Sequence, residues 1–409
     1  MPTLRFIQLA DLHLGAPFAW LPAEARAERQ RDQRRALEAA VAAAIDRRAT
    51  AILVAGDLFE SPGVDADTLA FAATAFARPG CPPVFLAPGA HDPAATPSPV
   101  WDPRLVAARG AAWPPHVCVF DAPAWERADL TAAPVTIWGR GVASATRAAR
   151  PLESRALPPA AQFEAARVHV AVFDGTLDGR GPAHAAPVAP FSAGEVIASP
   201  FAYLAAGCGH DALALDGPLG PRLATAGSAV AITPDEAGSH GALEVRIDRD
   251  SRRVEIEPLA LDDRRVLDVA VDATGAASPD AIDYRVAEAL RAAGATPRDL
   301  ARVRLTGRLA RGVRYAAPGA EAAGQAWIVR VDPRGLRPDH DLAGLRARVP
   351  TTTEDRFAHA LLAELDAETD ATKRARLAAA LYHGLDAFRL REVRPGYEAL
   401  AAPAAEVTP

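Results

Sequence analysis

Short apolar runs alternate with longer amphipathic stretches over the first ninety residues. Residues 4–9, 51–55 and 83–87 are apolar runs with the length of buried strands. Between them, residues 23–48 carry an apolar stripe at helical spacing, and residues 64–77 also have a helical pattern. This strand–helix–strand order predicts a parallel α/β sheet.

The middle of the chain is less regular but still rich in predicted strands. Apolar runs predict strands at residues 117–120, 135–138, 168–173 and 201–206. Two alternating segments, 242–247 and 254–259, predict a hairpin across residues 248–252. Residues 262–265 then form a plausible domain boundary, so we expect the first domain to span residues 1–262.

The rest of the chain predicts a small α+β capping domain over residues 263–349, followed by C-terminal helices over 350–400. The expected capping elements are strands at 266–271, 303–309 and 327–331 and a helix at 282–293, with mobile loops at 312–324 and 333–341. Residues 354–365 and 371–388 predict two amphipathic helices joined by a polar turn. They could dock on their own domain or bind a partner helix. The small-residue tail 401–409 is expected to be disordered.

Composition narrows the class of protein. Half the residues are apolar and 23% are charged, which is ordinary for a globular chain with a sizeable core. The net charge of −6 argues against a strongly basic nucleic-acid binder, although local arginine patches remain an alternative. The abundance of arginine beside a single lysine, Lys373, indicates coding bias. Three scattered cysteines fit neither a disulfide framework nor a CxxC metal knuckle, so we expect a reducing cytoplasm. No signal peptide or membrane-spanning run is apparent.

Acids and histidines follow several predicted strands at the point where each strand ends. They are Asp11, His13, Asp57, His91, Asp92, Asp174 and His210, with Cys208 beside the last of them. In an open α/β sheet, ligands bind outside the carboxyl ends of the strands. Carboxylates and neutral imidazoles there suit a divalent metal. For the first pair alone, a turn-capping Asp11 and an ordinary loop histidine remain an alternative.

Four motifs in this order resemble the calcineurin-like metallophosphoesterases, most closely their DNA-repair exonuclease branch, the SbcD-like nuclease subunits. The motifs are Ala10-Asp11-Leu12-His13-Leu14-Gly15, Gly56-Asp57-Leu58-Phe59, Gly89-Ala90-His91-Asp92 and Gly207-Cys208-Gly209-His210. The resemblance covers about residues 4–260 and continues more weakly into 381–387. It implies an α/β fold, a metallophosphoesterase β-sandwich flanked by helices, with a small α+β cap and a C-terminal helical hairpin.

The resemblance also implies roles for the residues at the strand ends. A two-metal site clamps the attacking and leaving oxygens of a phosphoryl transfer. The first metal would be held by Asp11, His13, Asp57 and His210, with Asp57 bridging to the second metal. His91 would act beside the phosphate as a proton donor or charge stabiliser, and Asp92 would orient it.

The second metal is where this sequence departs from the family pattern. Ala90 replaces an asparagine, while Asp174 and Cys208 each replace a histidine. Asp174 and Cys208 could still bind an ion; one metal alone could remain; or the site could be structural or bind phosphate without cutting it. Cys208 as a plain buried residue and Asp174 as a turn former are the simpler alternatives. Other histidines without motif context, His116, His169 and His184, are expected to be ordinary.

Taken together, the resemblance implies a metal-dependent phosphodiesterase that hydrolyses DNA in repair. Manganese is the family's usual ion, and the altered ligands leave zinc or iron possible, as one ion or two. The implied partners are DNA, an SMC-like coiled-coil ATPase and a second copy in a homodimer, with no membrane. The alternatives are a phosphoesterase for small molecules and a catalytically weak or silent subunit that scaffolds the ATPase.

Overall fold

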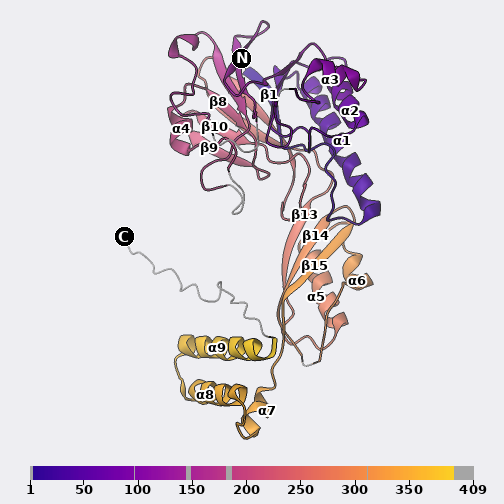
Figure 1. Cartoon of the computed structure of the whole chain (residues 1–409), viewed down its shortest axis with the longest axis vertical. Coiled ribbons are helices and arrows are strands. Elements are labelled where there is room, and N and C mark those ends of the chain that lie inside the picture. The colour runs from indigo at the N-terminus through magenta and orange to yellow at the C-terminus, as the bar shows by residue number, and fades with distance from the viewer. Residues whose placement is uncertain (1–2, 96, 144–148, 181–186, 311, 391–409) are drawn as a thin grey trace. The chain divides into compact units, whose positions relative to one another are not determined.

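Figure 1 shows the computed structural model of the chain, which describes residues 3–95, 97–143, 149–180, 187–310 and 312–390. Its compact units are Met1–Asp268 with Ala293–Arg302 and Gly324–Arg330, and Val269–Ala292 with Val303–Ala323 and Val331–Pro409. The tail 401–409, the end of the expected 350–400 segment and His184 lie outside the described residues. The domain boundaries expected at 262/263 and 349/350 stay predictions.

The first unit contains two six-stranded mixed sheets, which confirms the expected fold class. The first sheet has the order β12-β11-β1-β2-β3-β4, and the second has the order β5-β6-β7-β8-β10-β9. The strands of the first sheet are β1 (Thr3–Ala10), β2 (Ala51–Ala55), β3 (Val84–Ala87), β4 (Val117–Val119), β11 (Gly241–Asp248) and β12 (Val254–Ala260). Those of the second are β5 (Glu126–Leu130), β6 (Val135–Arg140), β7 (Val168–Phe173), β8 (Tyr203–Ala206), β9 (Leu213–Gly217) and β10 (Gly220–Thr225).

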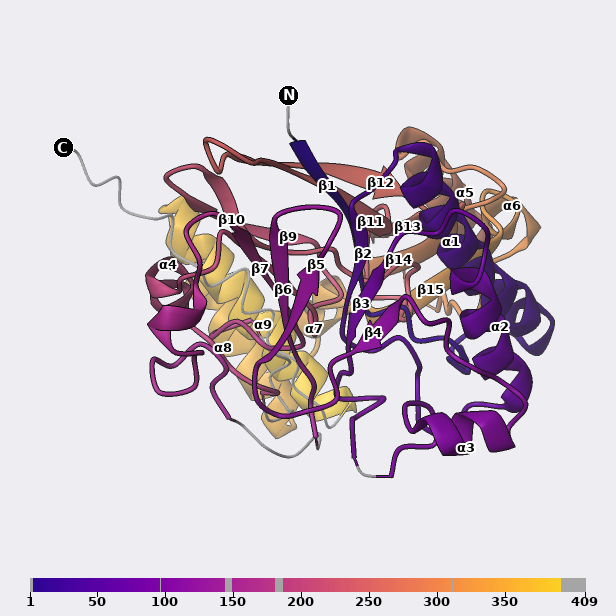
Figure 2. The ribbon, with the colours of Figure 1, turned by 90° about the horizontal axis from the view of Figure 1, so that it is seen from above.

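Apolar side chains hold these sheets in layers. Phe6, Leu53 and Val170 belong to a fully buried cluster contributed by both sheets. On the far face of the first sheet, residues from α1 (Ala23–Asp46) and α2 (Ala66–Phe76) join a second cluster. Figure 2 shows α1, α2 and α3 (Pro103–Ala108) on one side of the strands and α4 (Ala193–Ala198) on the other. A 3-10 turn at Ala160–Gln162 completes this unit.

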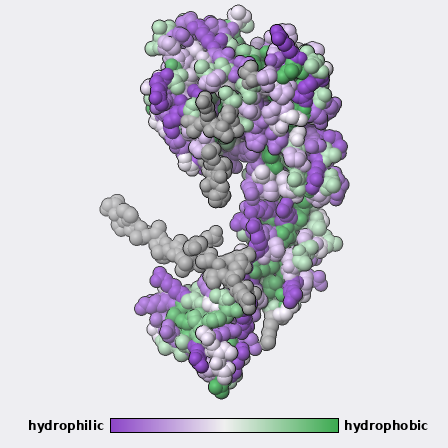
Figure 3. All heavy atoms as spheres, in the orientation of Figure 1, coloured by the Kyte–Doolittle hydropathy of each residue, from purple (hydrophilic) through white to green (hydrophobic). Residues whose placement is uncertain are grey.

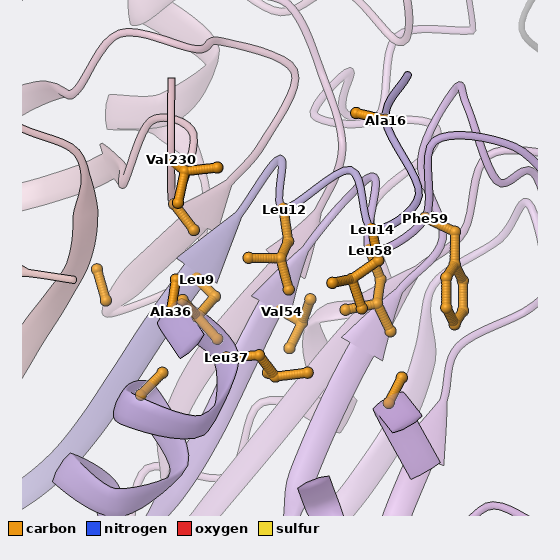
Figure 4. Close-up of a cluster of buried hydrophobic side chains, with 14 of the residues drawn as sticks. Leu9, Leu12, Leu14, Ala16, Ala36, Leu37, Val54, Leu58, Phe59 and Val230 are labelled. Atoms are coloured by element: carbon orange, nitrogen blue, oxygen red, sulfur yellow. The ribbon is translucent and has the colours of Figure 1, made fainter. Parts of the chain in front are cut away.

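The outer core reaches up to the end of β1. Figure 4 shows Leu9 and Val54 facing Leu37 of α1, with Leu12 and Leu14 beyond them in the loop after β1. These side chains are at most 1% exposed. Because Leu12 and Leu14 are both buried, they hold the loop after β1 against the rigid sheet. His13, which lies between them, is therefore held in place as well.

The second unit includes parts of a three-stranded sheet of order β13-β14-β15. The elements of this part of the chain are β13 (Val266–Asp272), α5 (Pro279–Ala292), β14 (Leu300–Leu309), α6 (Ala320–Ala323), β15 (Ile328–Pro338), α7 (Leu342–Ala347), α8 (Thr353–Ala367) and α9 (Ala371–Leu390). The first residues of β13, β14 and β15 belong to the first unit. The expectation of loops at 312–324 and 333–341 was wrong in part: α6 occupies the end of the first, and β15 runs through most of the second. Apolar residues of α7, α8 and α9 share one cluster.

A buried polar network ties α9 to the segment after β15. Asp386 accepts from Nη2 of Arg308 and from Nε2 of His340, both at 2.8 Å. The Arg308 guanidinium also lies 4.1 Å from the ring centroid of Tyr382, whose hydroxyl donates to Asp339. The Asp386 carboxylate is therefore compensated although it is buried. Among the described residues, no helix is long and apolar enough to cross a membrane.

Candidate metal centre

The site lies at the carboxyl ends of five strands. Polar residues follow β1, β2 and β3 of the first sheet and β7 and β8 of the second, and within each sheet these neighbouring strands are parallel. The loops after β1 and β2 are joined directly, because His13 N donates to Asp57 O at 2.9 Å. This edge gathers all eight site residues expected from the sequence, although they span two hundred positions.

Four of these residues adopt backbone conformations that L-amino acids rarely occupy. The φ angles are +46° at Asp11, +48° at His13, +47° at Asp57 and +69° at Cys208. Each such residue costs about 1–3 kcal/mol and persists only where the surroundings impose it. The shared conformation turns three chemically active side chains toward one place.

The first donor set consists of Asp11, His13 and His210, which offer ligand atoms within 4.8 Å of one another. The His13 and His210 rings lie 5.0 Å apart, and Nε2 of His13 is 3.9 Å from Oδ2 of Asp57. Nε2 of His13 and Oδ2 of Asp11 are buried with no hydrogen-bond partner. Buried polar atoms are normally satisfied, so these two atoms are consistent with a ligand that completes them.

The second donor set consists of Asp11, Asp57 and Asp174, which also meet within 4.8 Å. All three are at most 3% exposed, and Oδ1 of Asp174 has no hydrogen-bond partner. Burial and the charge of Asp57 raise the pKa of Asp11 to about 7 and the pKa of Asp174 well above its usual range. The raised pKa values favour the protonated forms of Asp11 and Asp174 in the metal-free site, whereas a bound cation favours their ionised forms.

Glycine is required where the strand-end loops approach one another. A Cβ on Gly89 would lie 2.4 Å from Oδ1 of Asp57 and 2.5 Å from its backbone nitrogen. A Cβ on Gly56, whose φ is +84°, would lie 2.6 Å from Oδ1 of Asp174. The absence of a Cβ at these two glycines therefore allows Asp57 and Asp174 to approach the neighbouring loops this closely.

Two glutamates that the sequence did not single out support the imidazoles. Oε2 of Glu60 lies 2.9 Å from Nδ1 of His13, and Oε1 of Glu236 lies 2.8 Å from Nδ1 of His210. Burial alone would lower the pKa of His210, but Glu236 and Asp11 together raise it to about 9. A carboxylate on the far nitrogen is the usual support for a metal-binding histidine. Only the position of Glu60, three residues after Asp57, could have suggested one of these pairs.

The structure corrects the role expected for Asp92. Its oxygens accept from the backbone N–H groups of Gly89, at 2.8 Å, and Phe59, at 3.0 Å. Nδ1 of His91 instead lies 3.2 Å from the Glu60 carbonyl oxygen. Asp92 thus fixes two loops, because it accepts from backbone N–H groups that would otherwise be buried without a partner. Glu60 takes the expected place beside His91.

His91 is the open member of the group. Its side chain is 49% exposed, and its ring lies 4.6 Å from that of His13 at an angle of 81°. Its backbone N–H donates to Oδ1 of Asp57 at 2.7 Å. This exposed imidazole is therefore open to a ligand that binds beside the buried donor sets.

Two of the altered positions form an apolar wall. Cys208 and Ala90 pack against Val142, Val188 and Ala189. The thiol lies 3.3 Å from Oγ1 of Thr176, and burial, followed by the charge of Asp174, raises the pKa of Cys208. This arrangement favours Cys208 as a plain buried residue over a thiolate ligand. Asp174, in contrast, joins the carboxylates.

A cavity of about 360 Å³ adjoins the imidazole side of the site. Its lining includes His210 and Cys208 together with Thr176, Leu177 and Arg180. Arg180 is exposed at its rim. A cavity of this volume has room for a small organic group beside the donor sets.

Comparisons with known proteins bear on the first part of the chain. Residues 4–137 match the family model of the calcineurin-like phosphoesterases. A search of curated proteins found no match. Among solved structures, TT1561 of Thermus thermophilus is similar at 14% identity over 63% of this chain and 99% of its own, with a TM-score of 0.35. GAP50, the anchor in the inner membrane complex of Plasmodium, is similar at 11% identity over 64% and 86%, with a TM-score of 0.41.

Proposed function

From the calcineurin-like metallophosphoesterase domain that the family match supports over residues 4–137, we propose that this chain is a metal-dependent phosphodiesterase that hydrolyses DNA. The observation that carries the metal centre is that the two donor sets share Asp11 and contain three buried donor atoms without hydrogen-bond partners. They are Oδ2 of Asp11, Nε2 of His13 and Oδ1 of Asp174. The DNA substrate rests on the resemblance of the four motifs to the repair exonucleases.

The residues divide the proposed work between two ion positions. Asp11, His13 and His210 would hold one ion, and Asp11, Asp57 and Asp174 the other, so Asp11 is common to both sets in place of the Asp57 expected from the resemblance. Bound ions would supply Lewis-acid stabilisation of the phosphate and of the leaving oxygen. His91 would donate a proton to that oxygen or stabilise its charge.

The donor atoms also bear on which metals would bind. A purely carboxylate position favours a hard ion, whereas imidazoles also suit zinc or iron. Manganese accepts both kinds of ligand, so manganese at both positions is the proposed state, with zinc or iron as alternatives at the imidazole side.

The proposed partners follow from the same resemblance. Phe388 on α9 is 43% exposed, and Figure 3 shows apolar residues gathered on the face of the α8–α9 pair. This face would dock a coiled-coil ATPase, with two copies of the chain forming a homodimer in the cytoplasm. Leu381 and Leu385 of α9 are already buried in a cluster with residues of α7 and α8. Docking would therefore use only the other apolar side chains of the α8–α9 pair.

The test is Mn²⁺-dependent digestion of linear duplex DNA by the full chain, compared with Asp57→Asn. The matched control is Asp46→Asn, an exposed aspartate at the end of α1. DNA cutting that is lost in the first variant and kept in the second supports the proposal.

Other outcomes select the alternatives. The cavity beside His210 favours a phosphoesterase for small molecules as the second candidate. Hydrolysis of bis(p-nitrophenyl) phosphate without DNA cutting would establish that candidate. Turnover of neither substrate, with the ATPase still bound, would identify a silent scaffold.

A further inference from the structure

A second cavity, of about 380 Å³, lies at the opposite edge of the second sheet. Its lining comes from residues that precede β7 and β8, from the β9–β10 turn and from the β11–β12 turn. The metal centre follows the other ends of β7 and β8. The two sites are therefore separated by the length of those strands.

The cavity walls are fixed by backbone contacts. At the β9–β10 turn, a Cβ on Gly220 would lie 2.2 Å from Val254 O, and Val254 N donates to Leu219 O at 2.8 Å. On the facing wall, Nη2 of Arg252 donates to Ala165 O at 2.9 Å. The shape therefore exists before any ligand binds, which lowers the entropic cost of binding.

The cavity carries an excess of positive charge. Three arginines and one glutamate line it, and that glutamate, Glu164, lies 2.5 Å from the guanidinium of Arg127. Nε and Nη2 of Arg222 donate only to the backbone carbonyls of Val196 and Ser199. Nη1 of Arg252 is buried with no acceptor. Neither Arg222 nor Arg252 forms an ion pair with a carboxylate among the described residues.

The remaining lining is mostly apolar. Phe201 is fully buried in the floor, Phe163 packs on its ring at 5.5 Å, and Leu219 is 50% exposed at the rim. His169 also lines the cavity, but its ring nitrogens are engaged by Trp138 and by the Glu164 carbonyl, so it adds no free donor. Flat apolar walls beside guanidinium groups suit a ring that carries a negative charge.

From this lining we infer that the cavity binds an aromatic anion of the size of a nucleoside monophosphate, independently of the metal centre. The ring would lie against Phe163 and Leu219. The anionic group would accept hydrogen bonds from Arg222 and Arg252. This site adds to the proposed phosphodiesterase and does not depend on it.

The test is calorimetric titration of the full chain, freed of metal with a chelator, with deoxyadenosine monophosphate. Separate titrations with inorganic phosphate and with deoxyadenosine measure how tightly the anionic part and the aromatic part bind alone. We expect the monophosphate to bind at least tenfold more tightly than either part. Leu219→Asp and Arg222→Met should each weaken binding at least tenfold, while Arg253→Ala, on the β11–β12 turn beside Arg252 but outside the cavity lining, should not.

Each other outcome overturns the inference. Equal affinity in the wild type and both cavity variants would place the ligand elsewhere, and binding that requires added Mn²⁺ would assign it to the metal centre. Leu219→Asp keeps the backbone bond from Val254 and alters an exposed side chain, so it separates loss of the site from loss of folding, checked by an unchanged melting temperature. Because metal is absent, the result does not depend on whether the chain cuts DNA.

Discussion

Glu60 holds the His13 ring from the side opposite the carboxylates. Oε2 of Glu60 is 2.9 Å from Nδ1 of His13, while Nε2 on the other side of the ring lies 3.9 Å from Asp57 and has no hydrogen-bond partner. When the ring proton is on Nδ1 and is donated to Glu60, Nε2 keeps the free lone pair that binds a metal. The pair thus orients the ring and sets its tautomer.

Glu60→Gln should weaken metal binding about 10–100-fold with little change in fold, because the amide keeps the shape but loses the charge that supports the ring. Isothermal titration with Mn²⁺ measures this. Glu38→Gln, an exposed change on α1, is the control. An unchanged affinity in Glu60→Gln would show that the glutamate only fills space.

Metal affinity should rise with pH between about 6 and 9. In the metal-free protein the pKa of Asp11 is about 7 and that of His210 about 9, so both groups hold protons at pH 6. A metal that binds must displace those protons. The protein therefore binds the metal more tightly at a higher pH, where fewer of these groups are protonated. Titration at one pH in buffers of different ionisation enthalpy counts the released protons. Release of none at pH 6 would contradict this account.

Gly89→Ala should abolish metal binding and destabilise the first unit. The added Cβ would meet Oδ1 and the backbone nitrogen of Asp57 within 2.5 Å, and overpacking of this kind costs about 1–3 kcal/mol. Gly209→Ala is the matched change, because its Cβ would meet nothing nearer than 3.9 Å. Metal content by mass spectrometry and thermal melts test the pair. If the two variants had the same metal content and the same melting temperature, the close contact between Gly89 and Asp57 would be refuted.

Asp386→Ala should destabilise the second unit by about 2–3 kcal/mol, because it leaves the buried His340 ring and the half-buried Arg308 guanidinium without their shared acceptor. Asp366→Ala removes an exposed partner of Arg346 and should cost no more than about 1 kcal/mol. Hydrogen exchange across α9 distinguishes the two. A larger loss of stability in Asp366→Ala than in Asp386→Ala would contradict this prediction.

The strands that carry the site could be predicted because each is an uninterrupted apolar run. Residues 51–55 and 168–173 match β2 and β7 at both ends. The β9–β10 hairpin was missed, because its strands are short and interrupted by Asp216, Pro221 and Arg222, and their neighbours in the sheet supply the stability.

The site residues could be located from the sequence, but their partners could not. Glu236 is 26 positions from His210 and belongs to no motif, so only the fold brings the two together. The same limit explains Asp92: adjacency to His91 suggested a contact, whereas the loop turns its carboxylate toward backbone donors. Spacing along the chain identifies the edge of the sheet; it does not say which side chains face one another.

The left-handed backbone at Asp11, His13, Asp57 and Cys208 has a consequence for anyone who tries to make this protein more heat-resistant. Glycine at these positions would relax the main chain and, at the first three, delete a metal donor. A screen that rewards melting temperature alone would therefore be drawn toward variants with an empty centre. Selection for thermal endurance should hold these four positions constant and seek its gains elsewhere.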